Sequence, residues 1–232
     1  MTDAERTATQ GPPAPEIRVP IAPTATGYRL AKRSLDLAAS AIGLVLASPL
    51  LLGVAIAVRS ESEGPILFRQ ERVGLGGRHF TVFKFRSMHA RADEAAHRDY
   101  VSRLLARKTA GPGDATWVPI AEDPRITRVG GFLRRSHLDE LPQLLNIIRG
   151  EMSLVGPRPP IPYEVELYEA WQLERLAVTP GLTGLWQASG WGRLSFEEGV
   201  RLDLEYVRRR SFWLDVRIIV RTIWQIVTGR QF

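Results

Sequence analysis

The sequence predicts an α+β protein that is mostly α, with a re-entrant membrane helix, cytosolic amphipathic helices and a small β hairpin or sheet. Three observations lead to this fold class. A charge-free apolar run covers 37–58, two short alternating runs surround a glycine cluster, and later segments have apolar residues at helical spacing. We expect a disordered tail over 1–27, the membrane helix over 28–60, and a cytosolic domain with interfacial helices over 61–232.

The composition restricts the partners and the chemistry. A net charge of +6 and a pI of about 10.1 indicate an anionic partner, which could be a phosphate-rich substrate, a nucleic acid or an acidic membrane surface. The chain has no cysteine, and this excludes disulfides, thiolate chemistry and zinc–thiolate sites. The first residues are rich in Pro, Ala, Thr and charge, a composition typical of disorder, and they lack the apolar core of a secretory signal.

The run from Leu37 to Val58 is long enough to span a bilayer. Lys32 and Arg33 precede it and Arg59 follows it, so the positive-inside rule favours the cytoplasm at both ends. A helix that enters the membrane and leaves on the same side satisfies this rule, whereas a spanning helix does not.

Ser48 and Pro49 lie within this apolar run and are predicted to form the break in the membrane helix. Proline removes one backbone hydrogen bond and bends a helix. The neighbouring serine hydroxyl can satisfy the freed carbonyl. The re-entrant form fits both the flanking charges and the proline, whereas a kinked spanning helix fits the proline alone, so the re-entrant form is favoured.

A hairpin is predicted within 65–88, around the turn Gly-Leu-Gly-Gly. The glycines lack the spacing and the following helix of a phosphate loop. In the second strand, we expect Phe83 and Phe85 to pack inward while Lys84 and Arg86 share a polar face.

Further helical segments are predicted after the hairpin, and Ser195 with Glu198 forms the capping signal of one of them. The last segment is apolar with scattered arginines, which fits either a core helix or a helix in the membrane interface. The predicted segments are 90–111, 122–135, 163–177, 195–211 and 211–230.

Two adjacent acids, Asp139 and Glu140, precede a proline and an apolar run. With Asp139 as N-cap, Pro142 falls in the first helical turn, where proline is tolerated. A helix N-terminus stabilises a carboxylate and can also hold a phosphate. A carboxylate can attack phosphorus to give an acyl-phosphate, and a second acid can act as base or metal ligand. The predicted buried stripe of this helix is Leu141, Leu144, Leu145 and Ile148.

The stretch "SLVGPRPP" places Arg158 between prolines in a stiff extended turn. A guanidinium group matches phosphate oxygens bidentately, so Arg158 is a candidate phosphate ligand.

Several of these stretches, in this order, resemble the monotopic bacterial phosphoglycosyl transferases, which prime polyprenol-linked glycan assembly. The stretches are "KRSLDLAASAIGLVLASPLLL", "GPILFRQERVG", "FKFRSM", "DPRITRVGGFLRRSHLDELPQLLNIIRGEMSLVGPRP" and "TPGLTGLWQASG". The similarity covers about 28–229, nearly all of the chain outside the tail.

The resemblance implies that 61–232 is a catalytic domain that transfers a sugar-1-phosphate from a UDP-sugar to undecaprenyl (polyprenol) phosphate and releases UMP. Asp139 would attack the phosphate that bears the sugar and form a covalent phosphosugar intermediate, which polyprenol phosphate would then attack. Glu140 would assist proton transfer. Mg²⁺ would offset the diphosphate charge and contact Asp139.

By position, Lys84, Arg86 and Arg158 are expected to contact phosphate. Asp203 lies in a family motif and is expected to be one of the substrate- and phosphate-binding residues. The family usually has Arg directly after "TGLWQASG", whereas this chain has Gly190-Trp191-Gly192-Arg193. Either Arg193 takes the phosphate contact from two residues on, or Trp191 stacks on the uracil or the sugar.

The resemblance also implies the partners and the location. We expect a UDP-sugar, a polyprenol phosphate lipid, the bacterial inner membrane with the domain facing the cytoplasm, and later glycosyltransferases of the same pathway. A homodimer is left open and no nucleic acid is expected. Two other functions compete: a basic membrane-anchored binding protein would not need the acid pair, and a phosphotransferase with a soluble acceptor would not need the broken apolar segment.

Overall fold

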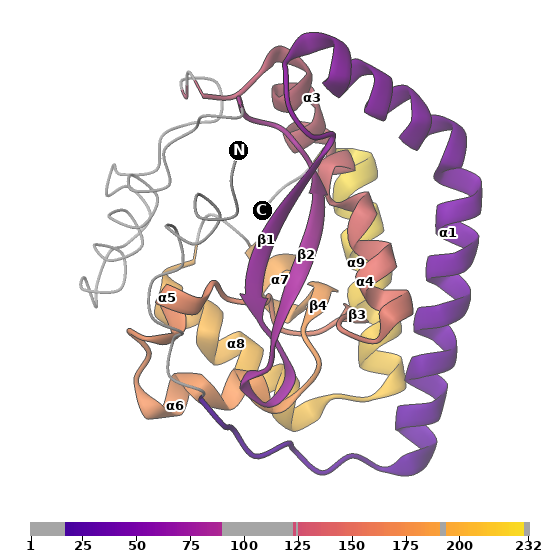
Figure 1. The fold of residues 1–232 in the computed structure, drawn as a ribbon. Coiled ribbons are helices and arrows are strands. Elements are labelled where there is room, and N and C mark those ends of the chain that lie inside the picture. Colours follow the sequence, from indigo (N-terminus) through magenta and orange to yellow (C-terminus); the bar gives the residue numbers. More distant parts are fainter. Residues whose placement is uncertain (1–16, 90–122, 124, 191–193, 230–232) are drawn as a thin grey trace.

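The computed structural model describes residues 17–89, 123, 125–190 and 194–229, and the predicted α+β, mostly α fold is confirmed. A long helix flanks one side of a body that contains a central hairpin (Figure 1). The helix predicted over 90–111 lies outside the described residues. The longer helices are α1 Thr26–Glu61, α3 Arg128–Ser136, α4 Leu144–Arg149, α7 Leu185–Gly190, α8 Phe196–Arg209 and α9 Phe212–Thr228. The strands are β1 Leu67–Val73, β2 His79–Phe85, β3 Ser153–Val155 and β4 Gly181–Thr183.

Helix α1 continues through Pro49, so the predicted break is a bend and not an interruption. A residue with an N–H at position 49 would donate to the carbonyl of Val45. Ser48 supplies that bond instead, because its Oγ donates to the Val45 oxygen at 2.8 Å. Figure 1 shows α1 curving over the body of the protein before it ends.

The two ends of α1 are fastened to the body, while its middle is exposed. Near the start, Lys32 and Asp36 bind β3 and its surroundings. Near the end, Val54 and Val58 are buried against Phe85 and Leu133. Little of the most apolar stretch is buried, whereas the core helix of a soluble protein would be mostly buried.

The predicted hairpin is confirmed: β1 and β2 pair antiparallel around a short 3-10 turn, Leu75–Gly77. Phe85 is buried as predicted, but Phe83 is only half-buried beneath the Arg149 guanidinium, 4.9 Å from the ring centre. Val82, on the face of Lys84, is buried instead. Both faces of β2 are therefore covered, which simple alternation did not predict.

The helix predicted over 163–177 is divided into three short pieces. Glu169 has an extended backbone and its N–H donates to the side chain of Gln172, which starts a new helix inside the predicted one. The three pieces are α5 Pro162–Val165, α6 Ala170–Leu173 and the 3-10 turn η4 Glu174–Ala177.

The capping signal of α8 is confirmed, because Ser195 Oγ accepts from the N–H of Glu198 and the Glu198 carboxylate accepts from the N–H of Ser195. The residues of α8 at helical spacing that face the core are Val200, Leu204 and Val207, all buried.

The disordered tail was predicted to extend to residue 27, which is wrong for residues 17–25. Ile17 and Val19 pack against a buried cluster that includes Val73. The N–H of Ala22 donates to the carbonyl of Ala177 at 2.9 Å. These apolar residues bury enough surface to hold an extended segment against the domain, although the composition around them is typical of disorder.

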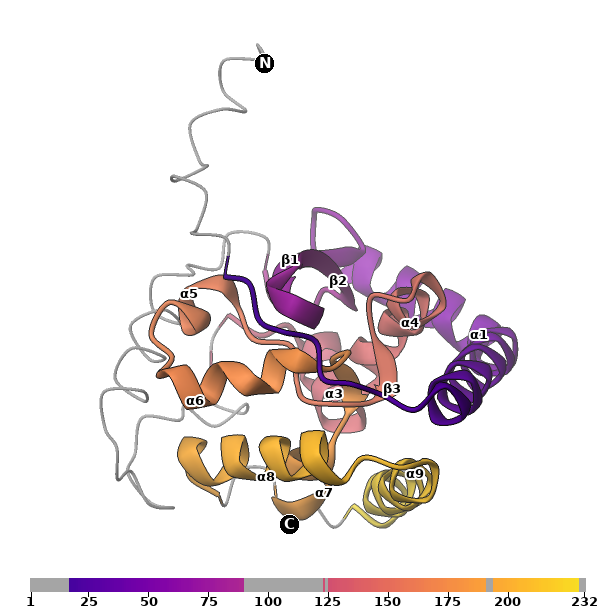
Figure 2. The ribbon, with the colours of Figure 1, turned by 90° about the horizontal axis from the view of Figure 1, so that it is seen from below.

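Helix α9 packs one side against the core and exposes an apolar face. Ile218 is buried, whereas Trp213 and Val227 are 74% and 79% exposed. A core helix would bury such residues, so the exposed face favours the second reading of this segment, a helix in a membrane interface. Seen from below, α1 and α9 lie at the same end of the molecule and are both viewed nearly along their axes (Figure 2).

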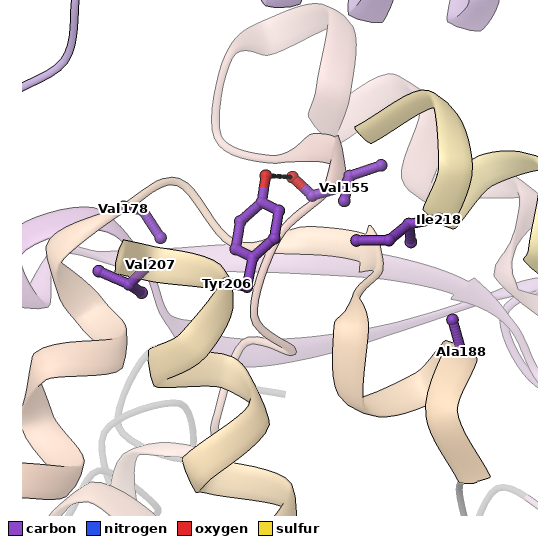
Figure 3. Packing of buried hydrophobic residues seen from close by; sticks show 6 residues of the cluster. All are labelled: Val155, Val178, Ala188, Tyr206, Val207 and Ile218. Atoms are coloured by element: carbon purple, nitrogen blue, oxygen red, sulfur yellow. Dashed lines mark hydrogen bonds between the residues drawn. The ribbon is translucent and has the colours of Figure 1, made fainter. Parts of the chain in front are cut away.

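The core beneath α8 and α9 encloses the hydroxyl of Tyr206, which is 1% exposed. Tyr206 belongs to a buried cluster that also contains Val155, Val178, Ala188 and Ile218 (Figure 3). The Tyr206 hydroxyl donates to the Val155 carbonyl or to Asp215, which lie at 3.1 and 2.8 Å.

Lys32 neutralises Asp215, which is 1% exposed, and also donates to Val155 and Tyr206. We expect Lys32→Met to lower the free energy of unfolding by about 3 kcal/mol, because it leaves a buried carboxylate without its counter-charge. Urea denaturation in detergent measures this loss. Arg29→Met removes an exposed cation one turn earlier and should cost less than about 0.5 kcal/mol. Equal losses for the two variants would contradict the assigned role of Lys32.

Candidate active site

The acid pair lies in a 3-10 turn between two helices. α3 ends at His137, whose left-handed backbone (φ 57°) directs the chain into η3, Leu138–Gln143. Pro142 lies inside η3, and α4 follows directly. Asp139 was predicted to be a helix N-cap, and this is wrong: His137 occupies the position before the turn, and no side chain caps η3.

The predicted stripe of this segment is partly wrong. Leu144 is buried as predicted. Ile147 is fully buried, although it was not part of the predicted stripe. Leu145 and Ile148 are exposed. The six-residue 3-10 turn rotates the following helix relative to a continuous α-helix, because 3-10 geometry has 3.0 residues per turn instead of 3.6.

Glu140 forms an ion pair with Lys84 of β2, with 2.6 Å between Oε1 and Nζ. Burial alone would raise the pKa of the Glu140 carboxyl group, but the positive charges of Lys84 and Arg158 lower it to about 2. Lys84 experiences the opposite effects: burial lowers its pKa and Glu140 opposes that change. The hairpin thus supplies a cation that keeps Glu140 ionised.

Asp139 is buried beside this pair and has the opposite pKa shift. Burial, followed by the charge of Glu140, raises the pKa of Asp139 above its ordinary value. Lys84 and Arg134 act against this rise. A carboxylate with a raised pKa is a stronger nucleophile. Partial removal of water from around the carboxylate also increases its nucleophilicity.

Arg158 lies close enough to Glu140, Lys84 and Arg72 for its charge to shift the pKa of each. Arg72 of β1 is 5% exposed, and its Nη1 donates to the carbonyl of Pro159 at 2.9 Å. Burial, followed by the charge of Arg158, lowers the pKa of Arg72 to about 10, so it remains a cation at neutral pH.

The charges that act on the acid pair are mainly positive. The charges of Lys84 and Arg134 lower the pKa of Asp139, those of Lys84 and Arg158 lower the pKa of Glu140, and the charge of Glu140 acts in turn on Arg72. Such a site attracts an anion with several negative charges, such as a diphosphate.

Two other predicted residues are placed differently. Arg86 is buried at the end of β2, where its Nη2 donates to the carbonyl oxygens of Val58 and Ser62 at the end of α1. Asp203 is fully buried on α8 and forms an ion pair with Arg175 at 2.5 Å. Neither contact points to the acid pair. Arg193 and Trp191 lie outside the described residues.

Sequence reasoning missed Arg72, Arg134 and Arg175. Arg134 stands five residues before Asp139, a spacing that could have suggested proximity. Arg72 and Arg175 lie in charged stretches that look like solvated surface, and no local pattern distinguishes them.

The comparisons with known proteins identify the family. The profile described as bacterial sugar transferase matches residues 27–229. The chain belongs to this family.

Several curated bacterial sugar transferases are similar to the chain. The exopolysaccharide production protein ExoY of Rhizobium meliloti is 39% identical over 208 residues, which is 87% of each chain. The UDP-glucose:undecaprenyl-phosphate glucose-1-phosphate transferase of Caulobacter vibrioides is 42% identical over 207 residues, 86% of this chain and 70% of that protein. The galactosyl transferase CpsE of Streptococcus agalactiae is 39% identical over 203 residues, 87% of this chain. This chain spans 43% of the length of CpsE.

In this bacterial sugar transferase, we expect Lys84→Met to raise the pKa of Glu140 well above 2, since the variant removes the nearest positive charge. The lowered pKa of Glu140 stabilises the fold above pH 4.5, its ordinary value, and this contribution is lost as the pH falls toward 2. Lys84→Met should therefore flatten the acid limb of the stability curve. Carboxyl ¹³C NMR titration measures the pKa. Arg78→Met, an exposed site on the hairpin turn, is the control and should change neither quantity.

Proposed function

We propose that the chain is a phosphoglycosyl transferase, which moves a sugar-1-phosphate from a UDP-sugar to undecaprenyl phosphate and releases UMP. The observation that carries this proposal is the buried Asp139 beside the Glu140–Lys84 ion pair, within a cationic environment that includes Arg158. The names of the relatives from Caulobacter and Rhizobium support the same reaction class and a role in exopolysaccharide synthesis.

The proposed reaction has two steps at one phosphorus atom. In the first step, the Asp139 carboxylate attacks the phosphorus that bears the sugar, and the bond from that phosphorus to the UMP oxygen breaks. In the second, a phosphate oxygen of the lipid attacks the same phosphorus, and the bond to Asp139 breaks. In this scheme both attacking groups react as anions, a carboxylate and a lipid phosphate, so neither step requires the removal of a proton from a neutral nucleophile.

Glu140 acts in this scheme as the counter-ion that holds Lys84 in the site. A carboxyl group with a pKa of about 2 is a weak proton acceptor at neutral pH. The proton-transfer role expected from the sequence requires a higher pKa, which the negative charge of a bound donor would supply.

Mg²⁺ is proposed as the cofactor. The described residues contain no group of three or more acidic or histidine side chains that could hold a metal by themselves. Magnesium is commonly held by one or two carboxylates together with substrate phosphates, and Asp139 fits that role. When bound, the ion would offset the negative charge of the diphosphate.

The membrane helix is proposed to enter and leave on the cytoplasmic face. Its exposed middle contains Leu46 and Leu52, and the cations Arg33 and Arg59 lie outside the apolar run at either end. This arrangement would bring the lipid phosphate and the soluble donor to the same side of the membrane.

An intact-mass measurement tests the reaction. The detergent-purified protein is incubated with Mg²⁺ and a panel of UDP-hexoses and UDP-N-acetylaminosugars, without lipid. We expect a sugar-phosphate adduct whose mass identifies the sugar class, and no adduct in Asp139→Asn, since an amide oxygen is a poor nucleophile toward phosphorus. The names of the relatives favour a hexose. UMP formed only after lipid addition, with no adduct, would favour direct transfer. The absence of both products would refute the proposed activity.

The lack of cysteine allows a clean test of membrane sidedness. Ser34→Cys and Ser60→Cys, both at exposed positions, should react with an impermeant maleimide only after cells are opened. Leu46→Cys, in the apolar middle, should react poorly in both conditions. Labelling of Ser60→Cys in intact spheroplasts would show that α1 spans the membrane.

A further inference from the structure

The turn that carries Arg158 is held by its backbone from several directions. Four consecutive carbonyls, those of residues 157–160, each accept a hydrogen bond from a different residue. The donors, in order, are the N–H of Gly181 (2.9 Å), Arg175 Nη2 (3.1 Å), Arg72 Nη1 (2.9 Å) and the N–H of Val73 (2.9 Å). The segment therefore has little freedom to move relative to β1, β4 and η4.

Backbone packing at the start of the turn restricts it further. Gly156 and Gly181 lie against each other, and a Cβ atom at Gly156 would come within 2.4 Å of the Thr179 carbonyl oxygen. The N–H of Gly156 donates to the carbonyl of Thr183 at 2.9 Å. Such close contact fixes the point from which the turn departs.

Arg175 is the donor to the carbonyl of Arg158 itself, and it is 3% exposed. Its Nη2 also donates to Asp203, and its Nη1 donates to the hydroxyl of Tyr168 at 2.9 Å. The guanidinium carbon lies 5.8 Å from the ring centre of Trp186. These contacts enclose Arg175, so it cannot reach a soluble substrate without leaving them.

The cost of burying this ion pair argues that its function is placement. Asp203 is fully buried, and burial raises its pKa to about 6 even though Arg175 opposes the change. Apolar residues of similar size are often as stabilising as a buried ion pair. A hydrophobic pair could fill this space, but it could not donate to the carbonyl of Arg158.

We infer that Arg175 is a positioning residue for Arg158: fixed by Asp203 and Tyr168, it holds the Arg158 carbonyl so that the guanidinium of Arg158 faces the Glu140–Lys84 pair. The inference rests on the proposed function. Asp203, which the sequence assigned to substrate binding, is thereby assigned to support of the turn that carries Arg158.

A double-mutant cycle tests the inference with the donor half-reaction, followed as adduct formation by intact mass over time. Arg175→Met should lower the apparent second-order rate constant by about 10²-fold, the size of effect expected when a substrate contact is misplaced by about 1 Å. In the Arg158→Ala background, the same change should lower it less than about 3-fold, because Arg175 acts through Arg158. Equal losses in the two backgrounds, or no loss in the wild type, would overturn the inference.

Two further variants distinguish a specific effect of Arg175 on the rate constant from general destabilisation of the fold. Val207→Ala weakens the buried cluster next to α8, the helix that carries Asp203, and it should lower the melting temperature but leave the rate constant nearly unchanged. Should Arg175→Met not fold, Tyr168→Phe removes a single contact to Arg175 and should give a smaller loss that also disappears in the Arg158→Ala background. A wild-type protein that forms no adduct and no UMP refutes the proposed function, whereas an active wild type with additive losses refutes only the role of Arg175.

Discussion

A chain of hydrogen bonds to residues 153–160, buried or partly buried, joins α1, the hairpin and the last two helices. Asp36 of α1 accepts from the Ser153 hydroxyl and the Leu154 N–H, at 3.0 and 2.9 Å. Lys32 donates to the carbonyl of Val155. Arg72 and Arg175 hold the following turn. Because unpaired polar groups in a core cost free energy, each of these elements is restricted to the positions in which the bonds are complete.

The same segment explains why a chain with so little β-sheet can position a site. The hairpin and the β3–β4 pair are separate two-stranded sheets, and two strands alone are rarely stable. Helix α1, the turn after β3 and the acid pair contact them on several sides. The strands act as supports that carry Lys84 and Arg72 toward Glu140, and the helices bury the apolar side chains around them.

The sequence was most informative where a residue's chemistry and its local pattern agree. Ser48 beside Pro49 predicts the replaced helix bond, and Ser195 with Glu198 predicts a helix start, because both depend on neighbours in the chain. The hairpin was predicted from its glycine turn for the same reason. The acid pair and Arg158 were selected from local chemistry, and the structure brings their charges together.

Long-range packing explains what could not be predicted. Asp139 was predicted to be the N-cap, but His137 holds the position before the 3-10 turn. The sequence could not predict this turn, because its geometry depends on packing against β2. Arg86 was assigned to phosphate, yet its partners lie at the end of α1, 24 residues away from it or more. Arg175 and Asp203 have no local pattern at all, since each is defined by a partner 28 residues distant.

The attachment of α1 near its start has a consequence for the order of synthesis. Lys32 and its partner Asp215 are 183 residues apart, so the ribosome makes the helix long before its partner. At about 5–20 residues per second, that interval is roughly 10–40 seconds. During this time the rest of the domain is incomplete, so α1 cannot yet pack against it. A nascent chain of this kind needs a lipid surface or a chaperone early, and a delay in either exposes its most aggregation-prone segment first.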